Sequence, residues 1–214
     1  TRGVERLRIG VVAGTMEDTP EGVVAAINDL RAMGHEIHDV HLPDLPYDSL
    51  QNILLAEAAA AFSDLTDSDQ DDQLAWQDDE AWPNTFRRAR LLSAVDHVQL
   101  DRLRFRVMEA FDAVFGEVDV LVGPPYAGSM LVATNFTGHP CLHLKAGLAT
   151  SAPRDSGVIG QSVPAAKPEG PAAKVPHGVS LWAGLYAEHH LLAVGQAIEA
   201  ALAVRDSRPP AFDT

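Results

Sequence analysis

The chain has 214 residues, of which 16 are Lys or Arg and 30 are Asp or Glu, so its formal net charge is −14. This acidic balance argues against binding to nucleic acid or to an anionic membrane surface, because neither attracts a polyanion. The single Cys excludes an intramolecular disulfide, and no apolar run approaches the roughly 20 residues that a membrane span needs. We therefore expect a soluble, cytoplasmic, globular protein.

The first part of the chain predicts a strand, a helix and a second strand. Leu7–Val12 is rich in β-branched residues, and a helix with Pro20 at its first position should follow and end at Gly34. His35–Leu42 then alternates like a strand. Short connections make this a βαβ unit, whose strands should be parallel and joined by a right-handed crossover.

The remaining pattern completes an α/β protein with four or five strands. Helices are predicted at Leu50–Leu65, at Phe86–Phe115 as one long helix, and at Ala187–Val204. Strands are predicted at Val118–Val122, Cys141–Leu144 and Gly178–Trp182. Residues 149–175 are dense in Ala, Pro, Gly and Ser, which is typical of a long loop or insertion.

More than half of the net charge comes from one acidic segment, residues 64–80, which holds eight acidic residues and no Lys or Arg. Its Asp-x-Asp spacing is compatible with a calcium loop, but such a loop needs a Gly that this segment lacks. We favour the other interpretation, a solvated and mobile surface segment.

Several motifs, taken in order, resemble the C-terminal half of the amidase-signature family. There a long helix leads to a D-V-L-x-x-P strand, an N-x-T-G-x-P turn, a P-x-G strand and a closing helix. The corresponding stretches are Ser93–Phe115, Val118–Pro124, Asn135–Leu142, Pro176–Trp182 and the helix led by Glu188. The resemblance runs from about Leu7 to Leu202 and implies a mixed β-sheet flanked by helices, with residues 1–214 as the C-terminal part of a single domain.

What the resemblance implies about function is hydrolysis of a carbon–nitrogen amide bond. The family uses a Ser–cis-Ser–Lys triad, which stands on a Gly/Ser-rich signature in its N-terminal half. No two serines are adjacent in this chain, and its only lysines are Lys145, Lys167 and Lys174. We therefore expect no catalytic residue, no cofactor and no metal here, and no amidase activity from the chain alone. A first residue other than Met fits excision from a longer polypeptide.

The resemblance also implies substrate-binding residues at the carboxyl ends of strands, where α/β proteins tend to bind ligands. These are Pro124, Pro125, Tyr126, Thr134 and Asn135. They would line a pocket for a small-molecule amide that the N-terminal half completes. The alternative is plain turn chemistry, in which Pro-Pro ends a strand and Asn precedes a Gly-Pro turn.

Two other functions stay open. The chain could be a non-catalytic binding or assembly module derived from the amidase fold, with self-association through exposed apolar surface. It could also be a zinc hydrolase, because His139, Cys141 and His143 alternate along a predicted strand and imidazole and thiolate are zinc ligands. We favour neither over the amidase interpretation. The histidines at positions 35, 38 and 41 are interpreted as edge or surface residues.

Overall fold

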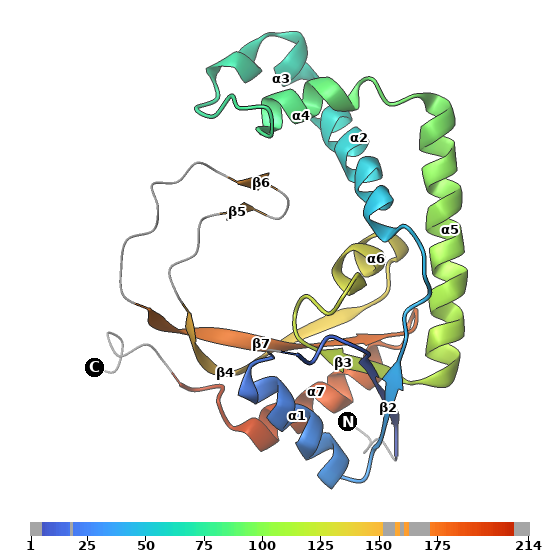
Figure 1. The fold of residues 1–214 in the computed structure, drawn as a ribbon, viewed down its shortest axis with the longest axis vertical. Coiled ribbons are helices and arrows are strands. Elements are labelled where there is room, and N and C mark those ends of the chain that lie inside the picture. The colour runs from blue at the N-terminus through green and yellow to red at the C-terminus, as the bar shows by residue number, and fades with distance from the viewer. Residues whose placement is uncertain (1–5, 18, 152–156, 159–160, 163–171, 208–214) are drawn as a thin grey trace. The chain divides into compact units, whose positions relative to one another are not determined.

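The computed structural model describes residues 6–17, 19–151, 157–158, 161–162 and 172–207. The chain divides into two compact units (Figure 1). The first comprises Thr1–Leu45, Val107–Ala149 and Lys174–Thr214, and the second comprises Pro46–Arg106 and Thr150–Ala173. No helix among the described residues is long and apolar enough to cross a membrane.

A five-stranded mixed sheet forms the first unit, with its strands in the order β2-β1-β3-β7-β4. The strands are β1 (Arg8–Val12), β2 (Glu36–Val40), β3 (Val120–Gly123), β4 (Cys141–Ser151) and β7 (Ala173–Ala183). β1 pairs in parallel with both β2 and β3, whereas β3 pairs antiparallel with β7. The predicted parallel βαβ unit and the mixed α/β class are confirmed.

Helices cover both faces of this sheet. α1 (Glu21–Ala32) and α7 (Glu188–Leu202) lie on one face, and α6 (Met130–Thr137) lies on the other (Figure 1). Alternation along the strands explains the division, because successive side chains of a strand point to opposite faces. Val179 and Leu181 of β7 belong to the core formed with α1 and α7. Ser180 and Trp182 alternate with them and therefore point to the opposite face of the sheet.

α1 begins one residue later than its sequence signals predict. Pro20 has extended backbone angles and is the N-cap residue, so Glu21 is the first helical residue. The helix ends before Gly34, whose φ of 92° favours glycine. The first turn packs closely on the sheet, because a Cβ added to Gly22 would lie 2.1 Å from the carbonyl oxygen of Ala146.

The second unit is built mainly from helices. They are η1 (Tyr47–Leu50), α2 (Gln51–Ala61), α3 (Ser63–Asp67), η2 (Gln70–Gln73), α4 (Trp82–Ala89) and the first part of α5 (Ala94–Glu117). Two predicted helices are therefore wrong in extent. Leu50–Leu65 is interrupted at Phe62, and Phe86–Phe115 is two helices separated at residues 90–93. The second break has a local cause, because the Ser93 hydroxyl accepts a hydrogen bond from the Asp96 amide and starts α5 anew.

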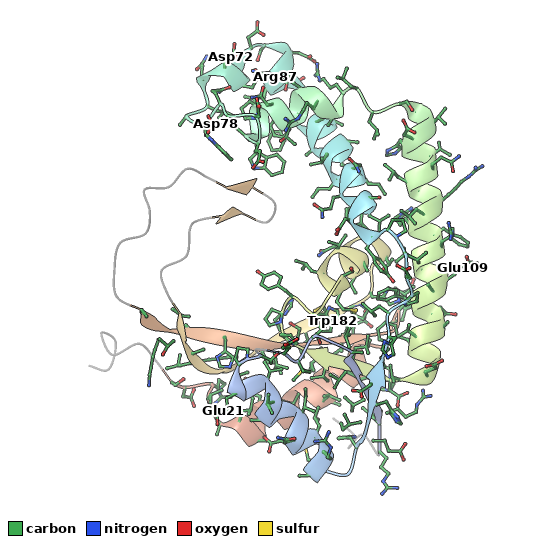
Figure 2. All side chains as sticks on the ribbon, viewed as in Figure 1. Glu21, Asp72, Asp78, Arg87, Glu109 and Trp182 are labelled. Atoms are coloured by element: carbon green, nitrogen blue, oxygen red, sulfur yellow. The ribbon has the colours of Figure 1, made fainter. Side chains whose placement is uncertain are left out.

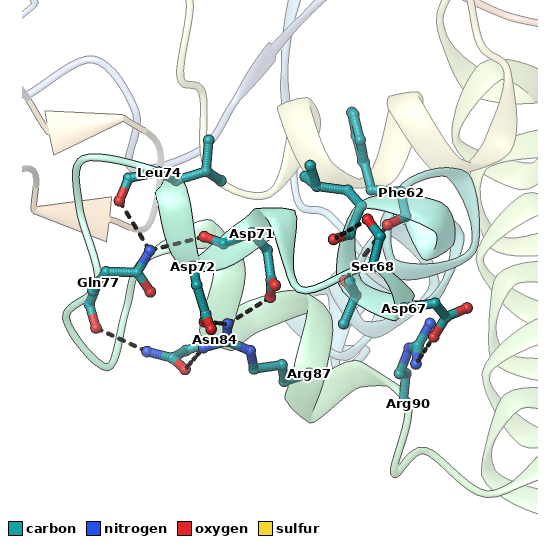
Figure 3. Close-up of polar contacts among 12 residues, drawn as sticks. Phe62, Asp67, Ser68, Asp71, Asp72, Leu74, Gln77, Asn84, Arg87 and Arg90 are labelled. Atoms are coloured by element: carbon teal, nitrogen blue, oxygen red, sulfur yellow. Dashed lines mark hydrogen bonds and ion pairs between the residues drawn. The ribbon is translucent and has the colours of Figure 1, made fainter.

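The acidic segment, residues 64–80, contains helical turns, and its exposed side chains agree with the predicted solvated surface position (Figure 3). Its acidic side chains are exposed except for that of Asp71, which is 1% exposed. Arg87 of α4 forms ion pairs with Asp71 and Asp72, and Arg90 pairs with Asp67 at 2.7 Å. Three of the carboxylates, those of Asp67, Asp71 and Asp72, are thus held by arginines of the same unit.

The predicted loop at residues 149–175 is wrong at both ends. β4 continues to Ser151, and β7 already begins at Ala173. Between them, β5 (Gly157–Val158) pairs antiparallel with β6 (Gln161–Ser162). Residues 152–156, 159–160 and 163–171 lie outside the described part of the chain.

Candidate functional site

A tight turn follows β3 and carries three of the predicted substrate-binding residues. The Ala127 amide donates to the Pro124 carbonyl over 3.1 Å, and the turn closes at Gly128, whose φ is 51°. β1 and β3 are parallel, so the turn lies at the carboxyl ends of both strands, as predicted for Pro124, Pro125 and Tyr126. Tyr126 is 64% exposed and is therefore available for contact with a ligand.

Close packing against the sheet fixes this turn. A Cβ on Gly123 would lie 3.2 Å from the Ala127 side chain and 3.8 Å from the Trp182 ring. Figure 2 marks Trp182, which is 1% exposed. A Cβ on Gly178 of β7 would lie 3.8 Å from the Pro125 ring. Pro125 therefore lies on the sheet face to which the even-numbered residues of β7 point.

Thr134 and Asn135 lie in helix α6 and not at the end of a strand, which corrects their predicted placement. The Thr134 hydroxyl is buried and donates to the Met130 carbonyl at 2.7 Å. Asn135 is exposed, and its side-chain amide donates to the Leu131 carbonyl at 2.7 Å. The N-x-T-G motif is thus the end of a helix, which stops at Gly138 with φ 78°.

A polar cluster joins β4 to β7, and it combines two of the candidate zinc ligands, Cys141 and His143, with Ser180, which the sequence did not single out. The His143 Nδ1 atom lies 2.6 Å from the hydroxyl of Ser180, and its Nε2 atom lies 3.4 Å from the Cys141 sulfur. Ser180 is fully buried, whereas Cys141 and His143 are exposed. Ser180 pairs with Gly123 across the sheet, which brings the cluster to the end of β3. The i, i+2 spacing of Cys141 and His143 is visible in the sequence, whereas the contact with Ser180 arises only from the pairing of β4 with β7.

The zinc hypothesis does not match the arrangement of its three residues. His139 precedes β4 and is buried against the rings of Phe111 and Phe115, with centroids 5.5 and 5.3 Å away. Its Nδ1 atom lies 2.7 Å from the Thr137 hydroxyl, and burial lowers its pKa. In the part of the chain that the structure describes, no three His, Cys, Asp or Glu side chains are arranged to hold a metal ion.

Two further histidines have perturbed environments. Both ring nitrogens of His177 are buried and have no hydrogen-bond partner among the residues that the structure describes, and burial lowers the pKa of this imidazole. His190 packs on His189 with a centroid distance of 4.1 Å, and burial also lowers the pKa of His190. His38 and His41 are exposed and His35 accepts a hydrogen bond from the Leu7 amide, so the predicted edge and surface positions are confirmed.

The second unit contains a hollow of about 410 Å³ between α2 and the start of α5. Its lining is rich in alanine, including Ala56, Ala59 and Ala60, with His97 among its few polar residues. The Arg90 side chain at its rim is already paired with Asp67. This hollow offers packing surface but no convergent set of polar groups for chemistry.

The position of Lys145 does not suit a catalytic base. Its ammonium donates to the carbonyl and the hydroxyl of Ser207. Lys174 lies at the exposed start of β7, and Lys167 lies outside the described residues. Among the described residues, Lys145 thus contacts one serine, Ser207, and its ammonium acts there as a donor to two oxygens of the same residue.

Solved structures identify the fold. 6-Aminohexanoate cyclic dimer hydrolase superposes with a TM-score of 0.66 at 19% identity, covering 96% of this chain and 47% of that one. A bacterial aryl acylamidase of the amidase-signature family gives 0.62 at 18% identity, covering 97% and 47%. Allophanate hydrolase from Kluyveromyces lactis gives 0.60 at 16% identity, covering 92% and 32%. The chain thus has the fold of the C-terminal half of amidase-signature enzymes, and the predicted resemblance is confirmed.

Sequence comparison agrees with the fold. A glutamyl-tRNA(Gln) amidotransferase subunit from Synechococcus sp. is 23% identical over 218 residues, which cover 91% of this chain and 45% of that protein. No family model matches the chain. The chain spans about half the length of this curated relative.

Proposed function

We propose that this chain is the C-terminal region of an amidase-type hydrolase that cleaves a carbon–nitrogen amide bond. It supplies the sheet, its helical cover and one wall of the substrate pocket, and a preceding half supplies the Ser–cis-Ser–Lys triad. The observation that supports this most strongly is the superposition on about half of several amidases. The absence of any adjacent serine pair in the 214 residues supports the location of the triad elsewhere.

The pocket wall is assigned to the turn after β3. Pro124 and Pro125 hold a rigid backbone there, because proline fixes φ. Tyr126 presents an exposed ring that can contact the apolar part of an amide substrate, and its hydroxyl can hydrogen-bond the polar part. Thr134 and Asn135 bond to their own helix, so their contribution to binding is indirect: they hold α6 in shape.

The test extends the reading frame upstream of the Thr1 codon and compares the extended protein with the present chain. We expect the extension to encode adjacent serines and a lysine, and the extended protein to hydrolyse an aryl amide such as acetanilide. The present chain should show no turnover. Turnover by the chain alone, or an extended protein without that serine pair, would contradict the proposal.

A second candidate, an assembly module, is favoured by exposed apolar side chains in the second unit. Leu91, Val95, Val98 and Phe105 are between 51% and 84% exposed. Val95, Val98 and Phe105 are three and seven residues apart on α5, which places them on one helix face. The occupant of this face would be a second copy of the chain. Sedimentation should then show a dimer, which V95D would convert to a monomer.

A further inference from the structure

We propose that Cys141, His143 and Ser180 form a thiol–imidazole–hydroxyl site that accepts an acyl group from an aryl ester onto the Cys141 sulfur. The three side chains project from one face of the β4–β7 pair. Leu142 and Leu144, on the opposite face of β4, pack against the core instead. The proposal is independent of amide hydrolysis, because it uses no residue of the expected triad.

The distances match those of a nucleophile, a base and a group that orients the base. The Cys141 sulfur lies 3.4 Å from Nε2 of His143, within reach for a thiol hydrogen bond. Nδ1 of the same ring lies 2.6 Å from the Ser180 hydroxyl. If Nδ1 carries the ring proton and donates to Ser180, then Nε2 is free to accept the thiol proton.

The acidity of the thiol explains why this base is needed. Although Cys141 as a residue is exposed, surrounding atoms desolvate its sulfur and raise the pKa of the thiol to about 11. At neutral pH the thiol therefore rarely ionises unaided, and the thiolate is the nucleophile. A contacting imidazole removes the proton during attack, so the reaction needs no stable thiolate.

The reaction balances without a cofactor. The Cys141 thiol transfers its proton to Nε2 of His143 while the sulfur attacks the acyl carbon of the ester. The carbon–oxygen bond to the aryl group then breaks, and the leaving phenoxide takes the proton from Nε2. The products are a thioester on Cys141 and a phenol, and the neutral imidazole is restored.

The surroundings leave room for an acyl donor. Cys141 and His143 are exposed. Ser180 is paired with Gly123, and Pro125 lies on the same sheet face as Ser180. The exposed aromatic ring of Tyr126, the next residue along the turn, offers an aryl ester a stacking surface near the end of β3.

The test treats the reduced chain with p-nitrophenyl acetate and follows p-nitrophenol release together with the intact mass. Because the chain has a single Cys, an acetyl group that neutral hydroxylamine removes and that C141S lacks is assigned to Cys141, whereas acetylated amines keep theirs. We expect one acetyl group per chain on Cys141, none on C141S, and at least about tenfold slower acetylation of H143Q, since a general base contributes 10²–10⁴-fold. H189Q is the matched control, because it removes an imidazole outside the site, and it should react like the wild type.

Two further variants separate chemistry from folding. H143A should regain acetylation when free imidazole is added, which a misfolded chain would not do. Ser180 is a positioning residue, so S180A should react about threefold more slowly and S180T should recover most of the rate. Acetylation of H143Q at the wild-type rate, an unmodified wild-type mass, or no rescue of H143A by imidazole would overturn the proposal.

Discussion

The Nη2 atom of Arg87 lies 2.7 Å from Oδ2 of Asp71, a buried carboxylate in the most acidic stretch of the chain (Figure 3). The same guanidinium reaches Asp72, and its Nη1 atom donates to the Asn84 side chain at 3.0 Å. Arg87 therefore ties the acidic segment to α4. A buried charge that loses its only close counter-charge is costly, whereas an exposed pair contributes little.

R87A should lower the free energy of unfolding by about 2 kcal/mol, because it removes the cation that is ion-paired with the buried Asp71 carboxylate. This is less than for a fully buried pair, since the Arg87 side chain is 37% exposed. Urea unfolding followed by circular dichroism measures the change. R104A, which breaks an exposed pair with Asp101, should cost less than about 0.5 kcal/mol. Equal losses in the two variants would contradict the structural role of Arg87.

G22A should destabilise the chain by about 2 kcal/mol or more, since the added methyl group would collide with the Ala146 carbonyl and force α1 away from the sheet. Gly116 in α5 gives a control of opposite sign. A Cβ there meets nothing within 4 Å, so G116A should stabilise the helix by about 0.5 kcal/mol. Thermal melting of both variants checks the prediction, which fails if G22A melts at or above the wild-type temperature.

Stability should fall as the pH drops from about 8 to 5, because burial lowers the pKa values of His139, His177 and His190 below the ordinary 6.5. In this window the unfolded chain binds more protons than the folded chain. The contribution is complete above pH 6.5 and is lost as the pH falls through 6.5 towards the lowered values. Urea unfolding across this range measures the slope.

H139F is the informative variant for this pH dependence. Phenylalanine keeps a ring packed against Phe111 and Phe115 but cannot bind a proton, so the slope between pH 8 and 5 should become shallower. Asp67 and Asp119, whose pKa values their arginine partners Arg90 and Arg8 help to lower, act only at more acidic pH. A slope that H139F leaves unchanged would show that His139 is not a source of the effect.

Y126A and T134V should separate ligand contact from structural support. Tyr126 is exposed, so Y126A should leave the unfolding free energy within about 0.5 kcal/mol of the wild type. In the upstream-extended protein, it should raise KM for an aryl amide. T134V removes a buried hydrogen bond to Met130 and should cost about 1 kcal/mol with little change in KM. A raised KM in T134V together with an unchanged KM in Y126A would assign the substrate pocket to α6 and not to the turn after β3.

The sequence predicts the first strand, helix and strand well because their patterns are local. The start of α5 can also be predicted from the sequence, since Ser93 and Asp96 have the spacing of a helix cap. Leu91 and Val95 continue an apolar pattern across the break, so the pattern predicts one uninterrupted helix. In the structure both side chains are exposed and do not belong to a buried helix face. An apolar period cannot distinguish a buried stripe from an exposed one.

The rule that ligands bind at the carboxyl ends of strands places part of the candidate site correctly and part of it wrongly. A Pro-Pro pair after an apolar strand marks a turn at a sheet edge, and Pro124 and Pro125 occupy such a turn. The predicted position of Thr134 at a strand end is wrong, because Thr134 lies in a helix and its hydroxyl donates to the Met130 carbonyl of that helix. The residue type alone does not reveal this hydrogen bond. The contact between His143 and Ser180 joins residues 37 positions apart, so only the pairing of β4 with β7 creates it.

The two outer strands of the described sheet differ in how they resist unwanted pairing. β2 has five residues, and Glu36, His38 and Asp39 are exposed along it, which is how natural proteins block edge-to-edge association. β4 is eleven residues long, and Lys145 is its only charged residue besides any charge on His143. An extended peptide can therefore add to the sheet beside β4 but is discouraged beside β2. At high concentration, we therefore expect strand addition, and with it aggregation, to occur at the β4 edge rather than at the β2 edge.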